Sequence, residues 1–253
     1  SEIVRGGNYD SQLDFLPIPT GASTQIRTWL DAIKNKGEVD VRRTEEGLPD
    51  PLVLWFSDLC QQEVLLTFFD YAGEIASNSD HSLRRRMLDA EGVLFFVDPL
   101  ADPDPQFDAL DAYCRDTHSR RLHVPVAVIV TKIDEIKRGG GKGTPEDVFL
   151  EEMECLDSKW QGHYPDVQLI LERSKATVSF LKNRWKKRVH RSIKRLGSNC
   201  SFFPTQSGRV KPTPGQPHAV ADDYRSMELL PRYVVEPCLW LLHEKGYRVF
   251  PKS

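Results

Sequence analysis

Two short runs of apolar residues, 93–97 and 124–130, constrain the fold of this chain more than any other feature. Neither run alternates with polar residues, and such continuous runs are typical of strands that are buried on both faces. Gly92 and Asp98 bound the first run, which should form a strand in the centre of a sheet. Between the two runs, residues 107–114 place apolar side chains at helical spacing. Strand, helix and strand in this order predict an α/β fold with a mostly parallel sheet and helices on both faces.

The rest of the chain adds an antiparallel ribbon and further helices to this pattern. Two apolar runs, 52–56 and 64–69, are separated by a short polar break, which predicts an antiparallel ribbon at the edge of the sheet. The later pattern predicts two helices, a short strand and a loop rich in proline and glycine, over 146–160, 175–196, 201–203 and 204–217. The pattern also predicts a last helix, whose apolar face comprises Val234, Cys238, Leu241 and Leu242. Pro237 is expected to bend this helix.

Charge and cysteine content exclude several classes of protein. The chain has 253 residues and a formal net charge of −3, which is typical of a globular protein and not of a nucleic-acid binder. Its five cysteines are odd in number and lack zinc-binding spacing, so we expect buried free thiols in a reducing cytosol. No apolar run is long enough to cross a membrane, and the sequence therefore predicts a cytoplasmic protein without a membrane partner.

Polar motifs follow three of the predicted strands, where α/β proteins bind nucleotides. The first motif is Asp-Tyr-Ala-Gly-Glu at 70–74, in which Asp70 can hold Mg²⁺ through water and the Gly73 N–H can approach a γ-phosphate. The second is Thr-Lys-Ile-Asp, which begins at Thr131. Asp134 can accept both N–H donors of guanine, and the stem of Lys132 can lie over the base plane.

The third motif, Phe-Pro-Thr-Gln-Ser-Gly at 203–208, offers the backbone amides of Gln206 and Ser207 to the guanine O6 atom. Each motif alone also fits a polar strand exit that caps a helix. The third motif is a weak signal alone, but the first two, in the right order and each after an apolar strand, favour a nucleotide site.

Together these motifs resemble the G3, G4 and G5 elements of the Ras-like small GTPases, with DYAG for DxxG, TKID for [NT]KxD and TQS for a degenerate SAK. The long segment before the ribbon, the DYAGE variant and residues 234–242 also resemble the bacterial double-GTPase group. The resemblance implies one GTPase-like domain over 1–253, with residues 1–50 on the switch I side and 51–253 as the core. It also implies a molecular switch that binds GTP or GDP with Mg²⁺ and signals to partner proteins.

Two further site residues come from the same resemblance. Thr44 is a candidate Mg²⁺ ligand in the switch I region, although an exposed loop threonine explains it equally well. Glu74 stands where Ras-like enzymes carry the glutamine that orients the attacking water, and it is the candidate catalytic residue. A carboxylate adds charge near the phosphates, so we expect slow or partner-assisted GTP hydrolysis. The alternative for Glu74 is a negative charge at a helix N-terminus.

The sequence contains no Gly-x-x-x-x-Gly-Lys-[Ser/Thr] P-loop, whose amides would cradle the β-phosphate. In a Ras-like sheet the P-loop strand lies between the strands that end before Asp70 and at Val97, so this core lacks its first strand. Three explanations are open. An N-terminal segment was removed or split off, another chain donates the strand, or the fold has lost nucleotide binding. We favour the first explanation, and the third would make the protein a pseudo-GTPase scaffold.

A basic run at 182–195 offers a further alternative, an adaptor that binds nucleic acid or an acidic partner. Such runs are usually solvated helix faces, and nucleic acid is not the partner that we expect. One stripe can pack while the cations stay in water, because Leu181, Trp185, Val189, Ser192 and Leu196 recur at helical spacing.

Overall fold

In a computed structural model, the chain is described over most of its predicted elements. The described residues are 14–21, 23–24, 27, 51–68, 90–118, 124–136, 143–159, 166–196, 199–206, 209–210, 227–228 and 232–250. The chain divides into two compact units, which are presented separately below. Unit 1 comprises Ser1–Asn78 and Gly208–Leu230, and unit 2 comprises Ser79–Ser207 and Pro231–Ser253.

Unit 1 contains an antiparallel sheet with the strand order β1-β2-β3. Its strands are β1 (Asp14–Pro17), β2 (Leu52–Ser57) and β3 (Glu63–Phe68). The predicted antiparallel pairing is confirmed, since β2 and β3 are antiparallel with Trp55 opposite Leu65. The predicted edge position is not, because among the described strands the ribbon forms a separate sheet with β1 and does not pair with the parallel sheet. The side chain of Asp58 shapes the turn between them, because its Oδ1 accepts hydrogen bonds from the N–H groups of Cys60 and Gln62, each at 2.8 Å. Unit 1 also contains the short antiparallel pair β7 (Arg209–Val210) and β8 (Met227–Glu228).

Unit 2 contains a parallel sheet of β4 (Val93–Val97), β5 (Val126–Val130) and β6 (Cys200–Pro204), in the order β4-β5-β6. Every residue of β5 is buried, as the apolar run predicts. The run at 93–97 also forms a strand, but among the described strands it lies at an edge and not in the centre. As a result, Phe96 on β4 is 61% exposed.

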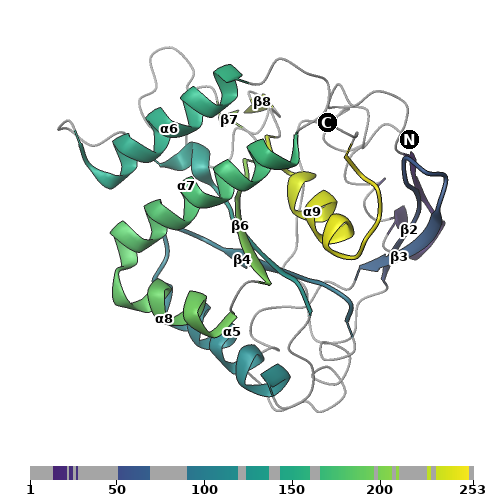
Figure 1. Cartoon of the computed structure of the whole chain (residues 1–253), viewed down its shortest axis with the longest axis horizontal. Coiled ribbons are helices and arrows are strands. Elements are labelled where there is room, and N and C mark those ends of the chain that lie inside the picture. The colour runs from purple at the N-terminus through teal and green to yellow at the C-terminus, as the bar shows by residue number, and fades with distance from the viewer. Residues whose placement is uncertain are drawn as a thin grey trace. The chain divides into compact units, whose positions relative to one another are not determined.

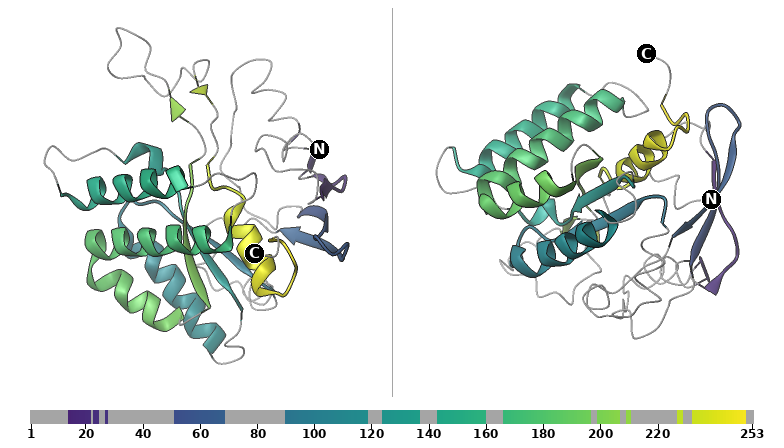
Figure 2. Two further views of the ribbon diagram at one scale, coloured as in Figure 1. Left: turned by 45° about the horizontal axis from the view of Figure 1, so that its top comes forward. Right: turned by 60° about the horizontal axis from the view of Figure 1, so that its bottom comes forward.

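Helices cover both faces of this parallel sheet (Figures 1 and 2). They are α5 (Pro103–His118), the 3₁₀ turn η1 (Ile133–Glu135), α6 (Pro145–Lys159), α7 (Val167–Trp185), α8 (Lys187–Leu196) and α9 (Glu236–Glu244). Figure 1 shows α6 beside α7, and α5 beside α8. Val128 of β5 belongs to the core that these helices bury, whereas Phe203 of β6 contacts Trp240 of α9, with ring centroids 5.5 Å apart. Phe202, the strand neighbour of Phe203, pairs with Val128 and belongs to the same core. Adjacent residues of a strand point to opposite faces, so α9 covers the face opposite that core.

Two helix predictions are wrong in their details. The helix predicted at 175–196 begins earlier, at Val167, where the side chain of Asp166 caps it, and it breaks at Lys186, whose φ is 38°. The last helix begins at Glu236, which places Pro237 in its first turn, where the missing N–H costs no hydrogen bond. Pro237 therefore does not bend the helix. Val234 lies before it and is 48% exposed.

The core of unit 2 joins the parallel sheet to the helix pairs. Between α6 and α7, the rings of Phe149 and Phe180 stack with centroids 4.6 Å apart, and both side chains are almost fully buried. The chain is thus a mixed α/β protein with a parallel and an antiparallel sheet, which confirms the coarse fold class. None of the helices in the described part of the chain is long and apolar enough to span a membrane. The expectation of buried thiols is wrong for Cys60 and Cys155, which are exposed.

Candidate functional site

The candidate site lies at the carboxyl ends of β4, β5 and β6. Because these strands are parallel, their exits share one edge of the sheet. The residues that directly follow the three strands are Asp98, Thr131 and Thr205. The sheet thereby brings together the motif at 131–134 and the described part of the third motif, residues 203–206.

The turn after β5 is held rigidly at its base. Thr131 donates from its backbone N–H and from its hydroxyl to the carbonyl of Val97, at 2.9 and 3.2 Å. Ile133 is 7% exposed and anchors the turn in the core. Lys132 adopts a left-handed conformation with φ 55° and ψ 33°, and both Lys132 and Asp134 are exposed. The turn therefore presents the two predicted base-reading side chains outward from a fixed support.

Asp98, which the sequence analysis treated only as a strand boundary, is the partner of Lys132. The Lys132 Nζ lies 2.9 Å from the Asp98 Oδ2. The Asp98 Oδ1 accepts from the N–H of Leu100 at 2.8 Å, which fixes the carboxylate. Partial burial opposes ionisation of Asp98, but the bonds from Lys132 and Leu100 outweigh it and lower its pKa. The hydrogen bond to Asp98 raises the pKa of Lys132, so this lysine stays charged.

The exit of β6 lies directly against the turn after β5. The N–H of Thr205 donates to Val130 at 2.8 Å, and the N–H of Ile133 donates to the Thr205 carbonyl at 3.4 Å. Gln206 pairs with Arg232 in an antiparallel bridge, with N–H to carbonyl distances of 3.1 and 2.9 Å. The Gln206 amide thus already has an acceptor, and the bridge must open before that amide can contact a guanine O6.

The other predicted site residues lie outside the described part of the chain. These are Thr44, Asp70, Gly73, Glu74 and Ser207, and their roles stay predictions. Among the residues that the structure describes, no group of three or more His, Cys, Asp or Glu side chains could hold a metal ion.

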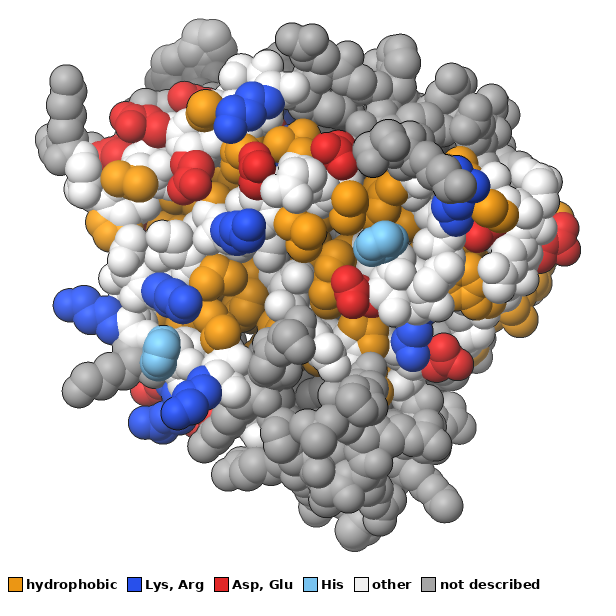
Figure 3. All heavy atoms as spheres, viewed as in Figure 1, with side chains coloured by type: hydrophobic (Ala, Val, Ile, Leu, Met, Phe, Trp, Pro, Cys, Tyr) orange, Lys and Arg blue, Asp and Glu red, His pale blue; other side chains and the backbone are white. Residues whose placement is uncertain are grey.

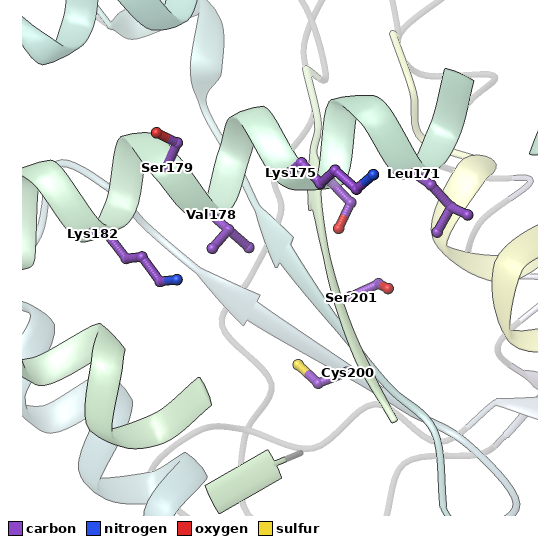
Figure 4. A pocket seen from close by; sticks show the side chains of 8 residues that line it. Leu171, Lys175, Val178, Ser179, Lys182, Cys200 and Ser201 are labelled. Atoms are coloured by element: carbon purple, nitrogen blue, oxygen red, sulfur yellow. The ribbon is translucent and has the colours of Figure 1, made fainter. Parts of the chain in front are cut away.

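A surface hollow of about 490 Å³ lies elsewhere, between α7 and the start of β6 (Figure 4). Cys200 and Ser201 line it from the strand, and Lys175, Val178 and Lys182 line it from the helix. Since β6 runs from Cys200 to Pro204, this hollow is at the opposite end of the strand from Thr205. It is not the predicted nucleotide site.

The basic run at 182–195 lies on two helices, the end of α7 and α8, and its apolar positions pack as the spacing predicts. Leu181, Val189 and Ser192 are buried. Two of the cations pair with carboxylates, Arg184 with Glu146 and Arg188 with Asp104 and Asp108. On the face drawn in Figure 3, acidic side chains gather over α6 and basic ones over α8.

No protein-family model matches this sequence, and no curated protein matches it. Any functional assignment therefore depends on the motifs and on the geometry at the strand ends.

Proposed function

We propose that this protein is a GTP-binding molecular switch of Ras-like architecture that hydrolyses GTP slowly or with help from a partner. One observation carries the proposal. The Thr-Lys-Ile-Asp turn at the end of β5 is hydrogen-bonded to the exit of β6, from Ile133 to Thr205. A base that rests against this turn would have the side chains of Lys132 and Asp134 on one side and the exit of β6 on the other.

The turn has the chemistry to select guanine. A carboxylate at Asp134 accepts hydrogen bonds from two adjacent N–H groups of guanine, and adenine offers no such pair. The aliphatic stem of Lys132 covers the base plane, while its ammonium stays on Asp98. Binding therefore requires no unpaired charge at the base.

The phosphate side of the proposal depends on residues outside the described part of the chain. Asp70 and Thr44 would hold Mg²⁺, Gly73 would sense the γ-phosphate, and Glu74 would orient the attacking water. A P-loop is needed from a segment that this sequence does not contain. The edge position of β4 among the described strands supports this view, since a Ras-like sheet carries the P-loop strand beside it.

Calorimetry of the full-length protein with GTP, GDP and ATP in the presence of Mg²⁺ tests the proposal. We expect guanine-selective binding that Asp134→Ala weakens about a hundredfold, because two hydrogen bonds to a charged acceptor are lost. Asp134→Asn should shift the preference toward xanthosine triphosphate, since an amide offers one donor and one acceptor. Glu135→Gln is the matched control, because Glu135 is an exposed acidic residue in the same turn.

A pseudo-GTPase scaffold that binds no nucleotide is the second candidate. Two observations favour it, namely the missing P-loop and the Gln206 amide that already bonds to Arg232. A full-length protein that binds neither GTP nor GDP would establish this alternative. In both cases we expect the output to be protein binding, with partners that contact the switch segments.

A further inference from the structure

A buried charged cluster lies close to the exit of β6, where the sequence pattern gave no indication of it. Arg173 on α7 is 1% exposed, and its guanidinium contacts two carboxylates. Its Nη2 lies 3.0 Å from the Oδ1 of Asp157 on α6, and its Nη1 donates to Glu236, the first residue of α9. The guanidinium carbon also lies 4.5 Å from the ring centroid of Tyr233. We refer to these four residues as the Arg173 cluster.

The cluster is costly to bury. Within it, the Nε of Arg173 and the Oε2 of Glu236 are buried without a hydrogen-bond partner. Burying an ion pair costs desolvation energy, which often exceeds the attraction between the two charges. Apolar residues of similar size would therefore stabilise such a core equally well. In some proteins, buried ionic groups favour one arrangement of the elements that carry them. Here those elements are α6, α7 and the segment that leads into α9.

Hydrogen bonds connect the cluster to the candidate site in a short path. The hydroxyl of Tyr233 donates to the Oδ2 of Asp157, and Tyr233 has a left-handed φ of 60°, which turns the chain at this point. Its neighbour Arg232 forms the bridge with Gln206. Gln206 follows Thr205, whose carbonyl accepts a hydrogen bond from the N–H of Ile133 in the turn after β5.

We propose that Arg173 is a positioning residue, which holds the Thr205–Gln206 loop beside the base-reading turn by fixing Tyr233 and Arg232. The expected consequence of this positioning, which is guanine selectivity, rests on the proposed function. The geometry does not, because the cluster and the bridge consist only of contacts within this chain. The two parts can therefore be tested separately.

Native-state amide exchange on the nucleotide-free protein tests the geometry. Tyr233→Phe removes one hydroxyl and leaves the ring against the guanidinium, so it is a mild variant. We expect the protection of the Gln206 amide to fall about tenfold, because a hydrogen bond to a charged group is lost. The amides of the central strand, such as Val128, should keep their protection. If Gln206 and Val128 lose protection by the same factor, the variant acts on the whole unit and the proposal is wrong.

Arg173→Lys is the stronger variant, since an ammonium keeps the charge but cannot span both carboxylates. Arg184→Lys is its matched control, because Arg184 lies on the same helix and pairs with Glu146 across the same two helices. We expect Gln206 to lose protection only in Arg173→Lys. Equal loss in both variants overturns the proposal.

Nucleotide selectivity tests the consequence. The ratio of the ATP and GTP dissociation constants should fall about tenfold in Arg173→Lys, because a displaced loop no longer bounds the base on the side opposite Lys132 and Asp134. A ratio equal to that of the wild type overturns the positioning role. If the wild type binds no guanine nucleotide, the proposed function fails together with the selectivity role, and amide exchange still decides whether the Arg173 cluster holds the loop.

Discussion

Replacing Glu236 with glutamine should stabilise the protein in a way that depends on pH. In the Arg173 cluster one cation faces two carboxylates, and Glu236 is the more buried of the two at 2% side-chain exposure, compared with 28% for Asp157. Burial raises the pKa of Glu236 to about 7, the charge of Arg173 opposes this rise, and Asp157 adds to it. Arg232 and Tyr233 are the other titratable groups at the cluster, and they contact Asp157.

The magnitude follows from proton linkage. The ordinary pKa of 4.5 applies in the unfolded chain, so between pH 4.5 and about 7 the folded protein holds a proton that the unfolded chain releases. The free energy of unfolding therefore falls as pH rises through this window, and the loss is complete above about 7. A difference of about 2.5 pKa units corresponds to about 3 kcal/mol. Glutamine has no proton to lose and still offers an oxygen to Arg173, so Glu236→Gln escapes this loss.

Urea denaturation of the wild type and of Glu236→Gln between pH 5 and pH 8, followed by tryptophan fluorescence, measures the effect. Trp240 on α9 is 2% exposed and reports unfolding near the cluster. The advantage of the variant should grow by most of the 3 kcal/mol over this range. Glu146→Gln is the control, because it removes a more exposed carboxylate from an α6–α7 ion pair and should change stability by less than about 1 kcal/mol. An advantage that stays constant between pH 5 and pH 8 would refute the reasoning.

Three further changes have expected outcomes. Phe180→Ala should lower the free energy of unfolding by about 3 to 5 kcal/mol in urea denaturation, because it empties a buried site stacked on Phe149. Lys186→Gly should raise the thermal midpoint by relieving about 1 kcal/mol of strain at φ 38°, and a lower midpoint would contradict this. Asp98→Ala should leave Lys132 without its carboxylate partner and weaken GTP binding several-fold in calorimetry, with the unfolding free energy changed by less than about 1 kcal/mol.

Much of the fold could be predicted from local pattern. The apolar runs at 52–56, 93–97 and 124–130 contain strands, as their short length, their flanking turn residues and their β-branched and aromatic content predict. The break at Lys186 could not be predicted, since neither glycine nor proline marks it and helical spacing continues across it. Tertiary contacts accompany the break, because beyond it α8 buries Val189 and brings the Ser192 hydroxyl within 2.9 Å of Asp111 on α5.

The candidate site, like the fold, could be predicted from the sequence only in part. The rule that polar residues after parallel strands gather at one edge marked Thr131, Lys132 and Asp134 as candidate site residues. The same rule applied to the first apolar run would have found Asp98, which directly follows β4. No rule of spacing could have found Arg232, because its bridge to Gln206 depends on how the segment before α9 returns to the sheet.

The sequence by itself determined strands β2 to β6, the α/β alternation and the polar turn at the end of β5, since each of these depends on neighbours within a few residues. The tertiary structure alone decided which charges meet. Lys132 and Asp98 are 34 residues apart in the chain, and Arg173 and Glu236 are 63 apart. Such pairs form only where packed helices and parallel strands bring distant side chains within hydrogen-bonding distance, and short-range pattern carries no information about that packing.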